Sequence, residues 1–286
     1  MATTIFLVNP FVGAAPPPPP PSYLLDTYSA TAAYSLRQLK TGVTNVVRVR
    51  RSSDNSEQDF TATEVTDGTL TTWTGANDGF VTTWYDQSGN GNNAPQTTAS
   101  NQPRLVNAGV LETKNGLPTV RFDNSNDYLY PASIGLSGSS LRSVFTVATP
   151  TSLSSVGGGY LGVGGSVTTG SVYDLCTESG RFALRVSGNS IYNTTINTTQ
   201  QYLFSTLQTT TTTAGMNLFI DGASVSQTST TSTTLNTTDD WYIGRQPNET
   251  DKYFAGNIQE IIIMASDEST NRTAIESDIN GHYSIY

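Results

Sequence analysis

The sequence is poor in the side chains that build metal centres and His-based catalytic sites. Its 286 residues include a single cysteine, Cys176, and a single histidine, His282. One cysteine excludes an intrachain disulfide framework. A zinc site or a His-based triad needs several such side chains, so the composition argues against both.

Charged residues are also scarce, at 13% of the chain, and the formal net charge is −9. Proteins that bind nucleic acid through a broad surface do so with clustered Lys and Arg, so the acidic balance argues against such a partner. No apolar run reaches about 18 residues, and no membrane-spanning helix is expected. The first residues have no basic stretch ahead of their apolar patch, so a signal peptide is not expected either.

Because charged residues are few, threonine, serine, asparagine and glycine must supply most of the polar surface. Threonine suits the pleated surface of a strand. The 14 Tyr, 10 Phe and 3 Trp residues are enough to build a core. Many short apolar segments are separated by turn signals, and strands do not alternate with helices. This pattern predicts an all-β sandwich in one domain over residues 23–286, with short helices near both ends.

The periodicity of apolar residues and the turn signals place the expected elements. Helices are expected over residues 23–40 and 270–286, the second capped by Ser269. Asn115-Gly116 and Asp221-Gly222 predict tight hairpins. Strands are expected at 43–51, 81–85, 118–122, 143–149, 202–207, 241–244 and 258–264, and the Asp221-Gly222 hairpin over 216–225 contributes two more. The strand at 258–264 is nearly all apolar, as is typical of a strand buried on both faces.

Residues 1–22 form a separate N-terminal segment. Its apolar side chains are Ile5, Phe6, Leu7, Val8 and Phe11. Six prolines follow at 16–21, and in the polyproline II form they make a stiff spacer of roughly 19 Å. Two interpretations are open: an arm that anchors the domain on a partner chain, or a disordered tail.

The segment 81–95, VTTWYDQSGNGNNAP, begins as a strand and turns into a polar loop. Oxygen-bearing side chains stand at alternate positions, as in the first half of an EF-hand calcium loop: Asp86, Ser88, Asn90 and Asn92. The twelfth position, where that loop needs an acidic residue, is Thr97. The alternative is a structural corner in which Asp and Asn bond to nearby backbone amides. A calcium ion is the one cofactor that the sequence suggests.

A basic cluster and the tryptophans supply the candidate ligand-binding residues. Arg48 and Arg50 lie on one face of an expected strand, close to Arg51 and Asp54. They would either form ion pairs inside the fold or hold a sugar or a carboxylate. Trp84 would either stack on a sugar or pack in the core.

Two groups of segments resemble known families. The segments NLFIDGASVS, WYIGRQ and FAGNIQEIIIMAS, followed by a closing helix, resemble the concanavalin A-like, laminin-G-type jelly rolls. The segments AAYSLRQL, VVRVRRSSDN and VTTWYDQSGNGNN resemble the catalytic domain of α-L-arabinofuranosidase B. They are also similar to laminin-G-like proteins of tailed bacteriophages, several of which sit on virions. The resemblance implies a jelly-roll fold over most of residues 23–286.

The enzyme resemblance implies a retaining glycosidase with a glutamate nucleophile, an aspartate acid/base and two adjacent cysteines beside the sugar. This chain has Cys176 but no adjacent pair. The nearest catalytic candidates are Asp174 and Glu178, and retention needs two carboxyl groups about 5–5.5 Å apart. We therefore expect the fold of the enzyme without its activity.

These observations predict a structural protein of a phage virion, either decorating the head or associated with a tail or fibre. The N-terminal arm would attach the domain to capsid or tail proteins on the exterior of the particle. Further expected partners are host-surface glycans and other copies of the same chain in a homo-oligomer or multi-copy assembly. An arabinofuranosidase-like hydrolase and a free lectin-like adhesion module are the alternatives.

Overall fold

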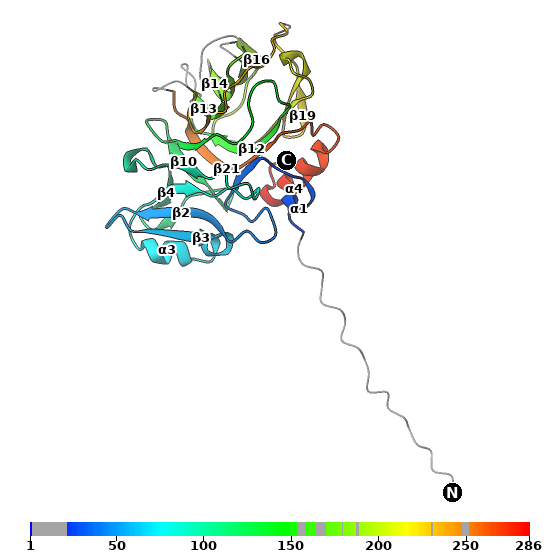
Figure 1. The fold of residues 1–286 in the computed structure, drawn as a ribbon. Coiled ribbons are helices and arrows are strands. Elements are labelled where there is room, and N and C mark those ends of the chain that lie inside the picture. Colours follow the sequence, from blue (N-terminus) through cyan, green and yellow to red (C-terminus); the bar gives the residue numbers. More distant parts are fainter. Residues whose placement is uncertain are drawn as a thin grey trace.

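Two β-sheets form the core of the protein in the computed structural model (Figure 1). The structure describes Met1 and residues 22–153, 158–163, 170–178, 180–186, 189–229, 231–247 and 252–286. The proline run lies outside these ranges. So do the predicted anchoring residues, Ile5, Phe6, Leu7, Val8 and Phe11.

The larger sheet is antiparallel and has the order β19-β18-β17-β12-β21-β10-β6-β4-β2-β3. Its strands are β2 (Asn45–Arg51), β3 (Glu57–Thr61), β4 (Gly79–Trp84), β6 (Arg104–Asn107), β10 (Val120–Asp123), β12 (Ser143–Pro150), β17 (Tyr202–Gln208), β18 (Met216–Ile220), β19 (Ala223–Val225) and β21 (Ala255–Met264). Three further strands pair beside this path: β1 (Ala32–Ser35) with β21, β5 (Ala94–Pro95) with β4, and β7 (Val110–Leu111) with β6.

The second sheet has the order β11-β20-β13-β14-β15-β16. Its strands are β11 (Leu129–Ala132), β13 (Gly158–Val163), β14 (Tyr173–Glu178), β15 (Arg181–Val186), β16 (Asn189–Thr194) and β20 (Trp241–Ile243). The remaining elements are β8 (Thr113–Lys114), β9 (Leu117–Pro118), α1 (Leu24–Thr27), α2 (Ala62–Thr66), α3 (Thr69–Thr74), α4 (Arg272–Tyr283), η1 (Ala99–Asn101) and η2 (Thr213–Gly215). The predicted all-β sandwich is confirmed.

β21 lies at the centre of the core and is buried on both faces, as its apolar sequence predicts. Ile261 and Ile263 belong to the cluster shared with the second sheet. Ile262 and Met264 belong to a second cluster, which also contains side chains of α1 and α4. Figure 1 shows α1 and α4 next to each other, close to the C-terminus. The larger sheet is therefore covered by the second sheet on one face and by these helices on the other.

The helix predicted over residues 23–40 is wrong beyond its first turn. α1 ends at Thr27, and β1 then pairs antiparallel with the C-terminal half of β21. All four residues of β1 are buried, so the strand shows no alternation of apolar and polar side chains. Without that alternation, the apolar residues of this segment matched the spacing of a helix.

The short helices α2 and α3 lie between β3 and β4, where no helix is expected from the sequence. Thr61 and Glu64 form a capping box at the start of α2, and the T-x-x-E spacing is the signal that would have predicted it. At the other end of the chain, α4 begins after Asn271, so the predicted cap Ser269 is wrong. Among the described residues, no helix combines the length and the apolar character that crossing a bilayer requires.

Both predicted hairpins are confirmed. Asn115-Gly116 joins β8 to β9, and Asp221-Gly222 joins β18 to β19. All four turn residues have positive φ, between 50° and 79°, which is the geometry that two-residue hairpin loops favour. The local turn chemistry therefore sets the register of these strand pairs.

Candidate functional site

The polar loop after β4 is a corner held by the carboxylate of Asp86. Its Oδ1 accepts hydrogen bonds from the backbone N–H groups of Ala33 and Ser88, both at 2.9 Å. Its Oδ2 accepts from the backbone N–H of Asn92 at 3.0 Å and from the Ser88 hydroxyl at 2.7 Å. Gly89 and Gly91 have φ values of +95° and +77°, which the turns of this loop require. The loop thus ties β4 to β1.

The predicted calcium ligands do not present a set of oxygens that fits the ion. Both oxygens of Asp86 already accept N–H groups, and Asn90 and Asn92 direct their amide nitrogens at the carbonyl of Thr31, at 3.0 and 2.9 Å. Calcium requires six to eight oxygen ligands. Within the ranges that the structure describes, no group of three or more His, Cys, Asp or Glu side chains could hold a metal. Calcium binding stays a prediction that this geometry does not favour.

Gln87, which the sequence did not single out, is fully buried in the same corner. Its amide nitrogen donates to the carbonyl oxygens of Ser35 and Arg37 at 2.9 Å, and its Oε1 accepts from the N–H of Leu39 at 2.8 Å. These bonds satisfy the backbone of the segment that follows β1. The corner is therefore part of the scaffold.

The candidate ligand-binding arginines have partners within the protein. Arg48 forms two hydrogen bonds to Asp59, at 2.7 and 3.0 Å, and this guanidinium lowers the pKa of the Asp59 carboxyl. Arg50 donates to Gln102 at 2.7 Å and lies over the ring of Phe80. Ion pairing or hydrogen bonding inside the fold is the outcome seen for both, and a contact with sugar stays a prediction.

Trp84 is fully buried, in contact with Tyr34, and belongs to the main core cluster. Stacking on a sugar requires an open ring face, which the indole does not have here. Of the two interpretations given to this side chain, the structure favours core packing.

The catalytic candidates Asp174 and Glu178 both belong to β14. Residues four apart in one strand have Cα atoms roughly 13 Å apart, which does not match the carboxyl separation of a retaining glycosidase. Asp174 is fully buried and lies 3.3 Å from the guanidinium of Arg185. That guanidinium also donates to Gln246 at 2.6 Å. The side chain of Glu178 lies outside the described part of the chain.

A different group of aromatic side chains forms a surface at the edge of the second sheet. We call it the tyrosine rim, and its members are Tyr128, Tyr130, Tyr242, Tyr253 and Arg245. The rings of Tyr130 and Tyr242 are stacked, with centroids 4.7 Å apart. The guanidinium of Arg245 lies 4.4 Å from the ring of Tyr128 and 4.2 Å from that of Tyr242. All five side chains are partly exposed.

The rim borders a cavity of about 250 Å³, lined by Tyr128, Tyr130 and residues 95–98. The hydroxyl of Tyr130 donates to Asp240 at 2.5 Å. This bond, together with burial, raises the pKa of Tyr130 and holds its ring in place. The sequence pattern did not predict the rim. The signal that could have revealed it is the alternation of Tyr128, Leu129 and Tyr130. Successive side chains of a strand point to opposite faces, so with Leu129 buried both tyrosines lie on the outer face.

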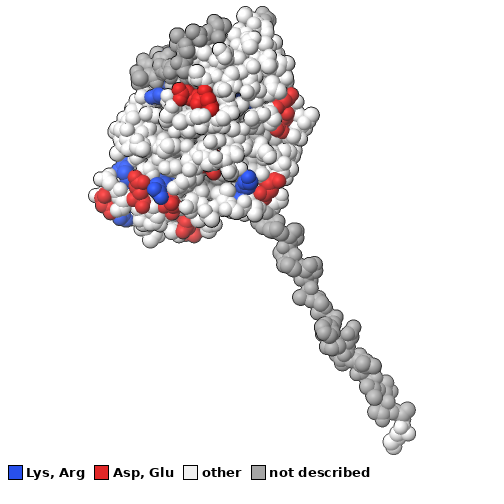
Figure 2. All heavy atoms as spheres, in the orientation of Figure 1, with Lys and Arg blue, Asp and Glu red and all other residues white. Residues whose placement is uncertain are grey.

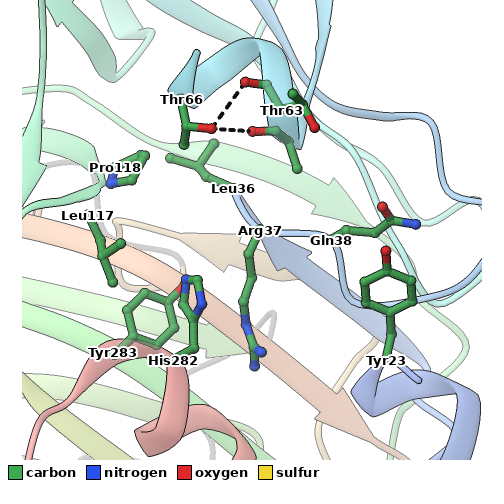
Figure 3. Close-up of a pocket in the computed structure, with 11 residues that line it drawn as sticks. Tyr23, Leu36, Arg37, Gln38, Thr63, Thr66, Leu117, Pro118, His282 and Tyr283 are labelled. Carbon is green, nitrogen blue, oxygen red and sulfur yellow. Dashed lines mark hydrogen bonds between the residues drawn. The ribbon is translucent and has the colours of Figure 1, made fainter. Parts of the chain in front are cut away.

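A cavity of about 280 Å³ lies between α2 and α4, and its lining side chains are shown in Figure 3. Its arginine, Arg37, forms ion pairs with Glu260 and Asp278, each at 2.8 Å. The Thr66 hydroxyl bonds to carbonyl groups of its own helix, and burial lowers the pKa of His282. The polar groups of this cavity mainly serve the scaffold, in contrast to those of the rim.

The chain belongs to the concanavalin A-like lectin/glucanase superfamily. The laminin-G family model described by that name matches residues 123–267, half of the chain. The match confirms the resemblance in the C-terminal segments, and the fold is the jelly-roll sandwich that this superfamily shares. No curated protein matched the sequence.

Solved structures of arabinofuranosidases have a similar fold. A GH54 α-L-arabinofuranosidase soaked with a cyclic sulfate inhibitor superposes with a TM-score of 0.66 and 14% identity, over 87% of this chain and 62% of that chain. An arabinofuranosidase complexed with arabinofuranosyl-α-1,2-xylobiose gives a TM-score of 0.57 and 16% identity, with the same coverage. This chain thus spans about 62% of the length of those proteins. At such identities the similarity shows the fold alone.

Proposed function

We propose that this protein is a non-catalytic, glycan-binding module on the exterior of a phage virion. The observation that carries the binding role is the tyrosine rim, where partly exposed rings lie beside a cavity. Sugars offer an apolar C–H face to aromatic rings and hydroxyl groups to nearby polar side chains. Tyr128 and Tyr130 line that cavity and supply the rings. Tyr242 stacks on Tyr130, and Arg245 supplies donors at the same place.

The character of the surface supports a glycan more than a charged macromolecule. On the face drawn in Figure 2, Lys, Arg, Asp and Glu occur in small groups of mixed sign, and most atoms belong to neutral residues. Such a face has no continuous field of one sign to attract a polyelectrolyte. Recognition by stacking and individual hydrogen bonds suits this surface.

The proposed place on a virion is supported by the N-terminal sequence and by the resemblance to phage proteins. An apolar segment ahead of a stiff proline spacer would reach a capsid or tail protein while the domain stays clear of it. Several copies on one particle would bind a glycan-covered surface more tightly than one copy through multivalency.

Glycan-array binding by the full chain tests the binding role, with Tyr242→Ala as the variant and Tyr286→Ala, at an exposed tyrosine next to Gly222, as the matched control. We expect the first substitution to lower glycan affinity at least tenfold and the second to leave it unchanged. Circular dichroism confirms that both variants fold. If no glycan binds, or if Tyr242→Ala binds like the wild type, the binding role is wrong.

Purified phage particles test the tether. The chain should be present in them, and deleting residues 1–15 should remove it. If particles lack the chain, or if the deletion leaves its incorporation unchanged, the virion role fails. Glycan binding without particle association would instead support a free lectin-like module.

An arabinofuranosidase-like hydrolase is the second candidate, favoured by the superposition with those enzymes. The buried state of Asp174 and its position in the same strand as Glu178 weigh against it. Hydrolysis of an aryl arabinofuranoside, abolished by Asp174→Ala or by Glu178→Ala, would establish this candidate in place of the non-catalytic role.

A further inference from the structure

Two arginines differ from all the others in the described ranges because their guanidinium groups make no hydrogen bond or ion pair with any described residue. They are Arg121 and Arg245. The others each make at least one such bond: Arg37, Arg48, Arg50, Arg51, Arg104, Arg142, Arg181, Arg185 and Arg272. Arg245 belongs to the tyrosine rim. Arg121 projects from β10 into a separate cavity, which we call the charged pocket.

The charged pocket has a volume of about 270 Å³. Its lining residues are Phe80, Ala99, Ser100, Gln102, Arg104, Arg121, Asp123 and Asp127. Arg104 stands opposite Arg121 in the pairing of β6 with β10, and its charge is offset by Glu112 at 2.6 Å. The guanidinium of Arg121 is left facing the pocket with its donors available.

Asp127 supplies an acceptor in the same pocket. Its side chain is largely enclosed, and its Oδ2 accepts the backbone N–H of Asp123 at 3.0 Å. Its Oδ1 accepts no hydrogen bond from any described residue. Burial and the neighbouring charge of Asp123 raise the pKa of Asp127 to about 7, so at neutral pH this carboxyl is present in both protonation states. A partly buried acceptor beside an arginine with available donors is an arrangement that favours a polar ligand.

The charged pocket and the rim cavity share one wall, the loop of residues 95–102. Residues 95–98 line the rim cavity, and Ala99, Ser100 and Gln102 line part of the charged pocket. Gln96 donates to the carbonyl of Tyr128 at 3.0 Å, and Gln102 donates to the carbonyl of Gln96 at 2.8 Å. Arg50 holds Gln102 from the other side. The wall is therefore fixed by hydrogen bonds before any ligand arrives, which lowers the entropic cost of binding.

We propose that the charged pocket is a second sugar subsite, which holds one residue of a neutral oligosaccharide while a neighbouring residue stacks on the tyrosine rim. Arg121 donates to one hydroxyl of that sugar and Asp127 accepts from the adjacent hydroxyl. An acidic sugar fits less well, because Asp123 and Asp127 stand beside the position where its carboxylate would lie. This inference rests on the proposed glycan-binding function and adds that the ligand is neutral and at least two residues long.

Calorimetry with the full chain tests the subsite. The probes are sugars of one, two and three residues from the arabino-, xylo- and malto- series, together with digalacturonate. We expect affinity to rise about tenfold or more from one residue to two, because a second residue adds hydrogen bonds to charged groups. Arg121→Gln should remove that rise and leave monosaccharide affinity unchanged. Arg48→Gln, at an arginine paired with Asp59, is the matched control and should leave every affinity unchanged.

The outcomes separate this inference from the function on which it rests. If the wild type binds sugars of all lengths equally, the second subsite is wrong. It is also wrong if Arg121→Gln lowers mono- and oligosaccharide affinity by the same factor. In both cases the tyrosine rim would still be the proposed glycan-binding site. Tighter binding of digalacturonate than of neutral disaccharides would overturn the neutral ligand. Absence of binding to every probe, together with an empty glycan array, would overturn the proposed function itself.

Discussion

The corner around Asp86 and the tyrosine rim with its charged pocket are both polar, but the corner is a loop that follows β4, whereas the rim and the pocket combine strand and loop residues. In the corner, Asp86, Gln87 and Ser88 form their hydrogen bonds with the protein's own backbone and with one another. At the rim and in the pocket, the guanidinium groups of Arg121 and Arg245 have no such bonds to described residues. The two regions therefore differ in where their hydrogen-bonding capacity is used.

The difference separates scaffold from binding surface. A ligand that approached the corner would have to break bonds that hold β1 and β4 together, whereas a ligand at the rim gains bonds without breaking any. Arginine shows the contrast within one residue type. Arg37 lies between Glu260 and Asp278, while Arg121 faces a cavity.

The largest expected effect tests the scaffold side of the comparison. Glu260 is almost fully enclosed and accepts hydrogen bonds from Arg37, Ser35 and Tyr283. Glu260→Ala should lower the free energy of unfolding by about 3–5 kcal/mol, because it leaves Arg37 without its main partner. Urea denaturation measures the loss. Asp59→Ala, in the partly exposed pair with Arg48, should cost less than about 1 kcal/mol, and equal losses would contradict the contrast.

Asp86→Ala is expected to have the next largest effect. The substitution removes the acceptor for four donors, including the backbone N–H groups of Ala33 and Asn92. Unsatisfied donors in a part-buried site should lower the free energy of unfolding by about 3 kcal/mol. Asp67→Ala, at an exposed turn, is the control and should leave the urea midpoint almost unchanged. A thermal midpoint that rises with calcium in the wild type but not in Asp86→Ala would instead favour a metal site.

A smaller effect is expected from Tyr130→Phe, which tests how the tyrosine rim contributes to glycan affinity. The hydroxyl holds the ring through Asp240, and its loss should lower glycan affinity about threefold, roughly 0.7 kcal/mol. Calorimetry measures the affinity. Tyr85→Phe removes a similar bond, to Asp59, on the scaffold side, and should leave glycan affinity as it was. Equal effects of the two substitutions would remove the distinction between the regions.

The stability of the folded chain is also expected to depend on pH through Asp127. Its pKa is raised to about 7 in the folded chain and is near 3.8 when unfolded, so the folded state binds the proton more tightly. Its contribution to stability is complete below about pH 4 and is lost as pH rises through 7. Asp127→Asn should therefore gain stability relative to the wild type between pH 5 and pH 8, as measured by urea midpoints. If the difference in urea midpoint between Asp127→Asn and the wild type did not change with pH, the carboxyl would not be shielded in the pocket.

The elements that could be predicted from the sequence are those with local signals. Asn115-Gly116 and Asp221-Gly222 specify their hairpins by backbone geometry, and the apolar run of β21 indicates burial on both faces. β1 was missed because burial on both faces removed its alternation. The corner was recognised because its residues are adjacent in sequence.

The rim could not be predicted in the same way because its members are distant in sequence. Tyr130 and Tyr242 meet only through the pairing of β11 with β20, and residues 95–102 reach them from the larger sheet. Nor does the sequence reveal which arginines have partners. Arg48 and Arg121 both stand in strands, and only the fold places Asp59 beside the first and a cavity beside the second.

The packing of α1 against α4 also has a consequence for engineering. Leu24 and Leu25 share a cluster with Ile275 and Ile279, so the two ends of the folded domain leave it close together (Figure 1). Domains with neighbouring ends can be inserted into a surface loop of a host protein without separating the host's strands. Residues 23–286 would thus serve as a cassette, displayed by grafting both ends into one exposed turn.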